Sequence, residues 1–309
     1  MVVFVAFLAF LGYGFDRFYL GGGSAPFPIG SVFALGIGSV SALSSYYAGD
    51  RAVLLSTGAI PTERAIAAAS EEDRLKLRQL ENVVDEMSIA AGLPRPKVYV
   101  IPDADPNAFA TGRDPDHASV AVTKGLLDAL NREELQAVVA HELSHVRNLD
   151  IRLMTVIAAM VGAAALLADW TGRGLLRSES GDGSSRGRDR GKNSDGLGII
   201  LLVIWLAAVV VAPLIGQALA MMVSRRREYL ADASGAELTR NPLALARALT
   251  KIDAAESPTA AIKRGTAHLC IADPLGRVIG LHEGKWANLM ASHPPMKNRI
   301  AALNEMGFQ

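Results

Sequence analysis

Two histidines one helical turn apart, in the run His141-Glu142-Leu143-Ser144-His145, carry the clearest chemical signal in the sequence. Residues i and i+4 of a helix lie on one face, so the two imidazoles can bind one cation together. Neutral imidazole suits zinc, which in catalytic sites takes three protein ligands and one water molecule. Glu142 can reach that water without binding the metal itself. The pattern predicts a zinc site at His141 and His145 with Glu142 as general base.

A third ligand is needed, because the motif alone also fits a solvated helix with two surface histidines. Glu228 and Asp232 form a second i and i+4 pair far along the chain. We predict that Glu228 completes the set of two histidines and one carboxylate around a single Zn²⁺ ion. Asp232 can accept the remaining N–H of a ligating histidine, with an ordinary surface acid as an equal alternative. Asn148 is a weaker candidate for that role, and a surface position is favoured for it.

The composition excludes some classes of protein and favours a membrane protein. The 309 residues carry 31 basic and 31 acidic side chains, so no net charge attracts nucleic acid and we expect none as a partner. Hydrophobic residues make up 50 % of the chain, more than a soluble domain usually needs, and they are concentrated in blocks. The single cysteine, Cys270, excludes an intrachain disulfide framework and a thiolate zinc cluster.

Four apolar blocks predict an integral membrane protein with about four transmembrane helices. The first block is short enough for a signal peptide, but no basic segment precedes it, and we predict a membrane helix. A hairpin of the third and fourth blocks would return the histidines and Glu228 to one face of the bilayer. The chain is thus predicted to divide into residues 1–49 (transmembrane helices 1 and 2), 50–152 (metallopeptidase domain with the histidine helix), 153–168 (transmembrane helix 3), 169–196 (disordered loop), 197–223 (transmembrane helix 4) and 224–309 (remainder of the domain with the third ligand).

The segment between the second block and the histidines predicts the core of a mainly α, zincin-like domain. A helix is expected from Ser70, a capping residue, to Gly92, and the histidine helix from about Asn131 to Arg152. Residues 97–101 and 118–123 are typical of strands in a small antiparallel sheet. Between them, an edge strand or a plain hairpin segment is expected. An unpaired edge can bind an extended peptide by backbone hydrogen bonds, and the candidate positions are Asn107, Ala108, Phe109 and Ala110.

The chain resembles the HtpX-type membrane zinc metalloproteases, relatives of the CAAX prenyl endopeptidases, from about Gly30 to its C-terminus. The motifs in common are His141 to His145 with Arg147-Asn148-Leu149-Asp150, Arg227 to Asp232, Pro106 to Gly112 and His293-Pro294-Pro295. The resemblance implies zinc ligands at His141, His145 and Glu228 and a catalytic base at Glu142. It also implies a multi-pass protein of the cell membrane whose catalytic domain faces the cytoplasm. Ser292 stands where the family pattern leads us to expect threonine.

The function expected from these motifs is zinc-dependent cleavage of misfolded or damaged membrane proteins, as part of proteolytic quality control and the stress response. His293 is our candidate for a second donor to the oxyanion, with a structural capping histidine as the alternative. The expected partners are polypeptide substrates and the lipid bilayer. A CAAX-type processing peptidase and a non-catalytic zinc-bearing membrane scaffold are the competing hypotheses. Basic residues flank both ends of the apolar blocks almost equally, so the cytoplasmic orientation follows from the resemblance alone.

Overall fold

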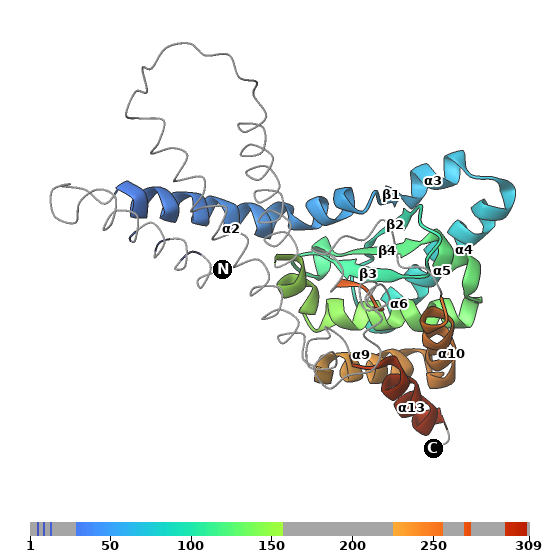
Figure 1. The fold of residues 1–309 in the computed structure, drawn as a ribbon. Coiled ribbons are helices and arrows are strands. Elements are labelled where there is room, and N and C mark those ends of the chain that lie inside the picture. Colours follow the sequence, from blue (N-terminus) through green and yellow to red (C-terminus); the bar gives the residue numbers. More distant parts are fainter. Residues whose placement is uncertain are drawn as a thin grey trace, which may run out of the picture.

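A computed structural model describes residues 29–156, 225–255, 269–272 and 294–307, together with the single helical positions 5, 9 and 13. Most of the first and third apolar blocks, the fourth block, the predicted loop and His293 lie outside the described residues. The elements are α2 (Ile29–Ser56), β1 (Ile60–Pro61), α3 (Thr62–Ala68), α4 (Glu71–Ala91), β2 (Lys97–Ile101), β3 (Ala108–Thr111), the short 3-10 helix η1 (Pro115–His117), β4 (Ser119–Thr123), α5 (Lys124–Ala129), α6 (Arg132–Arg147), α9 (Arg225–Thr239), α10 (Pro242–Asp253) and α13 (Met296–Gly307) (Figure 1).

The four strands form a mixed sheet in the order β1-β2-β4-β3. β2 and β4 run parallel, with Val98 opposite Val120, whereas the two outer pairs are antiparallel. The prediction of an antiparallel sheet is therefore wrong. After β2 the chain crosses to the outer position as β3 and then turns back into the gap as β4, which makes β4 parallel to β2. The prediction of an edge strand is confirmed, because β3 lies at one edge of this sheet.

The two faces of the sheet pack against different helices, because successive side chains of a strand point to opposite faces. One face joins the main core with α4 and α6 and carries Val98, Val100, Ala108, Ala110, Val120 and Val122. The other face carries Ile101, Phe109 and Ala121, which pack against the end of α2 and Met154. Thus α2 continues past residue 49 and its last turns cover the sheet.

The two long helices of the domain begin at capping residues. The Ser70 side chain accepts a hydrogen bond from the Asp73 N–H, and α4 ends before Gly92, which has a positive φ of 66°. Asn131 and Glu134 form a reciprocal capping box at the start of α6. We predicted that this helix continues to Arg152, but it ends at Arg147. Leu149 has a φ of 60°, so the chain turns before residues 150–156 become helical again.

Helix α2 extends away from the domain as a long rod (Figure 1). Within the described residues it is the one helix long and apolar enough, by length and composition, to cross a membrane, over Ser31–Ser56. Two tyrosines near its middle contact the domain. Arg152 donates a hydrogen bond of 3.0 Å to the Tyr46 hydroxyl, and the Arg113 guanidinium lies 5.5 Å from the centre of the Tyr47 ring. These contacts join the apolar rod to the domain that carries the histidines.

Candidate metal centre

Close packing of α6 against α9 brings the two halves of the site together. Gly235 faces His141 so closely that a Cβ atom there would lie 3.1 Å from the His141 nitrogen and 3.3 Å from its Cα. Glu228 and Asp232 precede Gly235 at spacings of seven and three residues, which places all three on one face of α9. A residue without a side chain at position 235 thus lets the two carboxylates approach the histidines.

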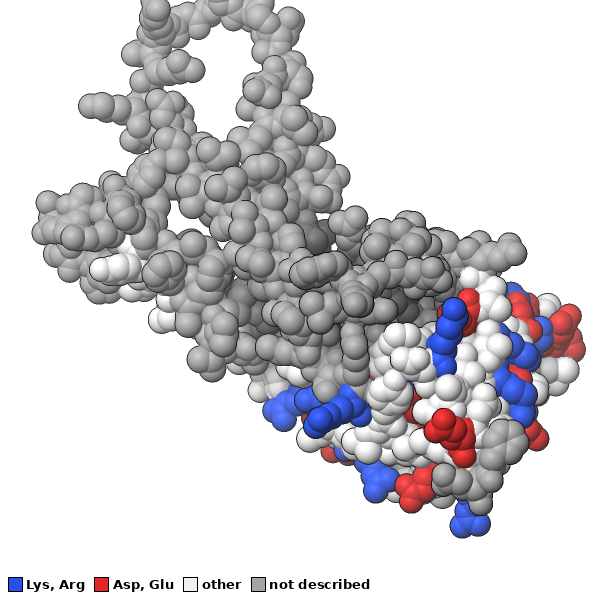
Figure 2. Space-filling view, turned by 60° about the horizontal axis from the view of Figure 1, so that its bottom comes forward, with Lys and Arg blue, Asp and Glu red and all other residues white. Residues whose placement is uncertain are grey.

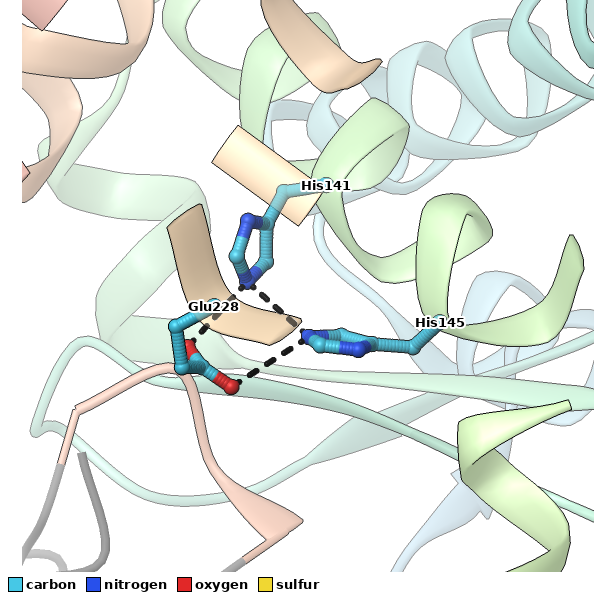
Figure 3. A group of neighbouring side chains, drawn as sticks. All are labelled: His141, His145 and Glu228. Carbon is cyan, nitrogen blue, oxygen red and sulfur yellow. Dashed lines mark hydrogen bonds and ion pairs between the residues drawn. The ribbon is translucent and has the colours of Figure 1, made fainter. Parts of the chain in front are cut away.

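The three predicted ligands form one buried cluster. Nε2 of His141 lies 3.3 Å from Nε2 of His145. The Glu228 carboxylate faces both, with Oε2 3.8 Å from His141 Nε2 and Oε1 3.6 Å from His145 Nε2 (Figure 3). One ligand atom from each residue lies within 4.8 Å of the others, and all three side chains are buried. Glu228 is far from the two histidines in the sequence, but the fold brings it next to them, as predicted.

The donor set fits zinc. Nδ1 of His141 lies 3.0 Å from Asp232 Oδ1, and Nδ1 of His145 lies 3.1 Å from Asp150 Oδ2. A carboxylate beside Nδ1 favours a proton on that nitrogen, so the Nε2 atom of each histidine is the one that can bind a metal. These two nitrogens and the Glu228 carboxylate converge in one buried site, as the ligands of a single metal ion do. Nitrogen ligands about 2.0 Å from a tetrahedral zinc ion are roughly 3.3 Å apart, which matches the observed separation.

Buried charges shift the pKa values of two groups around the ligands. Burial alone would lower the pKa of His145, but its hydrogen bond to Asp150 and the charges of Glu228 and Glu142 raise it to about 9. Burial would raise the pKa of Asp232, but the charge and hydrogen bonds of Arg299 lower it to about 2. Asp232 is therefore an anion at neutral pH and can act as the acceptor beside Nδ1 of His141.

Glu142 is buried beside the ligands and points toward the edge strand. Burial raises the pKa of Glu142, while the charges of His141 and His145 and a hydrogen bond from the Ala110 N–H act in the opposite direction. Asn107 directly precedes β3, which contains Ala108, Phe109 and Ala110, and all four are buried. The backbone of the edge strand and the Glu142 carboxylate thus border the same side of the metal cluster.

The side chain beside Nδ1 of His145 is the carboxylate of Asp150, and not the amide of Asn148. Asn148 is exposed and forms the C-cap of α6, where its N–H donates to the Ser144 carbonyl. The left-handed turn at Leu149 then directs Asp150 back toward His145, and the other oxygen of Asp150 accepts a hydrogen bond of 2.7 Å from Arg227. This partner was missed because the prediction assumed an unbroken helix.

Arg299 was also missed as part of the site. It lies on α13, its side chain is fully buried, and it forms two hydrogen bonds of 2.7 and 2.8 Å with Asp232. The only signal in the sequence is an arginine six residues after His293, and that spacing gives no reason to place it near Asp232.

The sequence of this chain matches known proteins over most of its length. The model of "Peptidase family M48" matches residues 74–307. A "Protease HtpX homolog" of Thermoanaerobacter pseudethanolicus is 47 % identical over 263 residues, which are 85 % of this chain and 80 % of that protein. Another, of Streptococcus pneumoniae, is 38 % identical over 306 residues, which are 99 % of this chain and 95 % of that protein. The crystal structure of S. mikatae Ste24p is a distant likeness, with 19 % identity and a TM-score of 0.49, over 98 % of this chain and 63 % of that one. The chain belongs to peptidase family M48, as an HtpX-type zinc metalloprotease whose zinc site consists of His141, His145 and Glu228.

Proposed function

We propose that this protease is an endopeptidase that cleaves misfolded or damaged membrane proteins, with Glu142 as its catalytic base. Zinc, when bound, supplies a Lewis acid that polarises the peptide carbonyl and lowers the pKa of water. The Glu142 carboxylate takes a proton from the attacking water and returns it to the leaving amine. The observation that carries this proposal is the buried Glu142 carboxylate between the histidines and the edge strand, because metal binding alone needs no acid at that position.

The edge strand supports a substrate bound in extended form beside Glu142. Asn107 is bonded to β4, since its carbonyl accepts a hydrogen bond from the Thr123 N–H, and bonded positions alternate in an antiparallel pair. The backbone groups of Ala108 and Ala110 therefore point away from β4. The Ala108 carbonyl accepts a hydrogen bond from the Ile271 N–H, whereas the Ala110 N–H faces Glu142. A peptide whose N–H pairs with the Ala110 carbonyl would have its backbone next to the base.

The apolar rod supports a membrane protein as substrate. Side chains of α2 such as Phe33, Val40 and Leu43 are more than half exposed, whereas Val53 and Leu54 at its end are buried against the sheet. A helix with this pattern holds the catalytic domain at the surface of a bilayer, where partly extracted membrane segments would meet it.

On the face shown in Figure 2, basic and acidic side chains are interspersed, which suits polypeptides of varied charge. We further propose four membrane crossings and a cytoplasmic domain.

A cleavage assay on the full chain in liposomes tests this function. The substrates are casein, a helical membrane protein in folded and destabilised forms, and a prenylated peptide with a C-terminal CAAX sequence. We expect chelator-sensitive cleavage of casein and of the destabilised membrane protein, and none of its folded form. Preferred removal of the last three residues of the prenylated peptide would indicate a CAAX-type processing peptidase instead. Equal loss of each substrate with and without chelator would contradict metal-dependent proteolysis.

A further inference from the structure

Arg299 is a fully buried cation next to the zinc ligands, and its burial costs free energy of desolvation. A buried guanidinium loses its hydration, so it requires anionic partners with good geometry. The side chain exposes 0 % of its surface, and its Nη1 donates a hydrogen bond of 3.1 Å to the Ile271 carbonyl. Its remaining donors face the metal cluster. The packing of α13 alone does not require a charged side chain at this position.

The guanidinium fixes the orientation of the Asp232 carboxylate. Nε of Arg299 donates to Oδ2 at 2.8 Å, and Nη2 donates to Oδ1 at 2.7 Å. This two-pronged pairing holds both oxygens in one plane with the guanidinium. The same Oδ1 atom lies 3.0 Å from Nδ1 of His141. A chain of contacts therefore runs from Arg299 through Asp232 to a zinc ligand.

Arg299 also contacts the cluster directly. Its Nη1 lies 3.4 Å from Oε2 of Glu228, and its Nη2 lies 3.5 Å from Nε2 of His141. Asp150 has Arg227 as its cationic partner, and Asp232 has Arg299. Arg299 thus contacts the carboxylates of both Asp232 and Glu228.

We propose that Arg299 is a positioning residue of the zinc site, which aims Asp232 at His141 and thereby sets the zinc affinity. The inference rests on the zinc ligands and not on the proposed substrate, so either can fail without the other. Partners of ligating histidines typically change metal affinity 10- to 100-fold when they are lost. Arg299 does not touch Nδ1 of His141 but holds Asp232, the residue that does.

Zinc dissociation constants of the purified full chain, from competition with a chelator, test this role. Arg299→Met should weaken zinc binding by roughly 10- to 100-fold, and Arg299→Lys should restore only part of it, because an ammonium ion lacks the planar fork. The visible spectrum of the cobalt-substituted protein should change in both variants. Lys297→Met, at an exposed position of the same helix, is the control and should leave both measurements unchanged.

A double substitution separates positioning from general packing. If Arg299 acts through Asp232, then Arg299→Met with Asp232→Asn should weaken zinc binding no more than the stronger single substitution does. Losses that multiply would overturn the proposal, as would a normal zinc affinity and cobalt spectrum in Arg299→Met. Should Arg299→Met yield no folded protein, Arg299→Lys decides, since wild-type affinity with an unchanged spectrum in that variant contradicts the role.

Discussion

Oδ2 of Asp150 lies 3.1 Å from Nδ1 of His145, on the far side of a left-handed turn. Its other oxygen accepts a hydrogen bond from Arg227, the residue before Glu228. Asp150 therefore orients one ligand on α6 and contacts the start of the helix that carries the third ligand. This arrangement makes Asp150 part of the metal centre although it binds no metal.

Replacement of Asp150 by asparagine should weaken zinc binding by roughly 10- to 100-fold, because the amide is a weaker acceptor for the His145 N–H. Competition with a chelator measures the change. Asp114→Asn is a matched control, since Asp114 lies 2.6 Å from Nδ1 of His117 in an exposed pair remote from the ligands. Equal zinc affinities for the two variants would refute the role of Asp150.

Substitution of Gly235 should disturb the approach of α9 to α6. Alanine favours a helix by about 1 kcal/mol over glycine, yet its Cβ would press on the backbone of His141. We expect Gly235→Val to lower the free energy of unfolding by about 1–3 kcal/mol. Gly235→Ala and Gly235→Val should both bind zinc more weakly, because the added side chain displaces Glu228. Gly36→Ala is the control, as a Cβ there meets nothing within 4 Å. Unchanged zinc affinity in Gly235→Val would contradict this account of the packing.

Zinc affinity should increase with pH up to about pH 9. His145 has a pKa raised to about 9 by Asp150, Glu228 and Glu142, so zinc must displace a proton at neutral pH. Because the pKa of His145 is higher in the folded than in the unfolded protein, protonated His145 stabilises the zinc-free fold. This contribution is fully present below about pH 6.5 and is lost as the pH rises through about 9. Titration of the zinc dissociation constant and of the chelator-treated protein's melting temperature checks both trends. An affinity independent of pH between 6 and 9 would contradict them.

Removal of the third ligand should abolish tight zinc binding. Glu228→Ala leaves two histidines, which bind zinc much more weakly than three protein ligands do. Metal analysis after gel filtration should show little zinc in this variant. Glu237→Ala, at an exposed position of the same helix, should retain a full complement. Normal zinc content in Glu228→Ala would assign the third position to another residue.

Local sequence patterns were enough to locate the ligands and most elements around them. Spacings of four residues defined the pairs on α6 and α9, and capping residues such as Ser70 and Asn131 marked where helices begin. These signals depend on neighbours within one or two helical turns. The zinc site follows from them once α6 and α9 pack against each other.

Contacts between distant segments were not predictable in the same way. The parallel pairing of β2 with β4 depends on where the chain crosses, which side-chain alternation does not specify. Asp150 depends on a positive φ at Leu149, a residue type that rarely adopts this conformation. Arg299 reaches Asp232 only because α13 packs beside α9, and a single arginine has no periodicity that would reveal this contact.

The most direct test of the central claim is to measure zinc content and casein cleavage together in Glu142→Gln. The glutamine amide preserves the shape of the side chain but cannot accept the proton from the attacking water. We predict one zinc ion per chain, as in the unchanged protein, and cleavage lower by a factor of at least about 10². Undiminished cleavage by a fully zinc-loaded Glu142→Gln protein would contradict the assignment of Glu142 as the base.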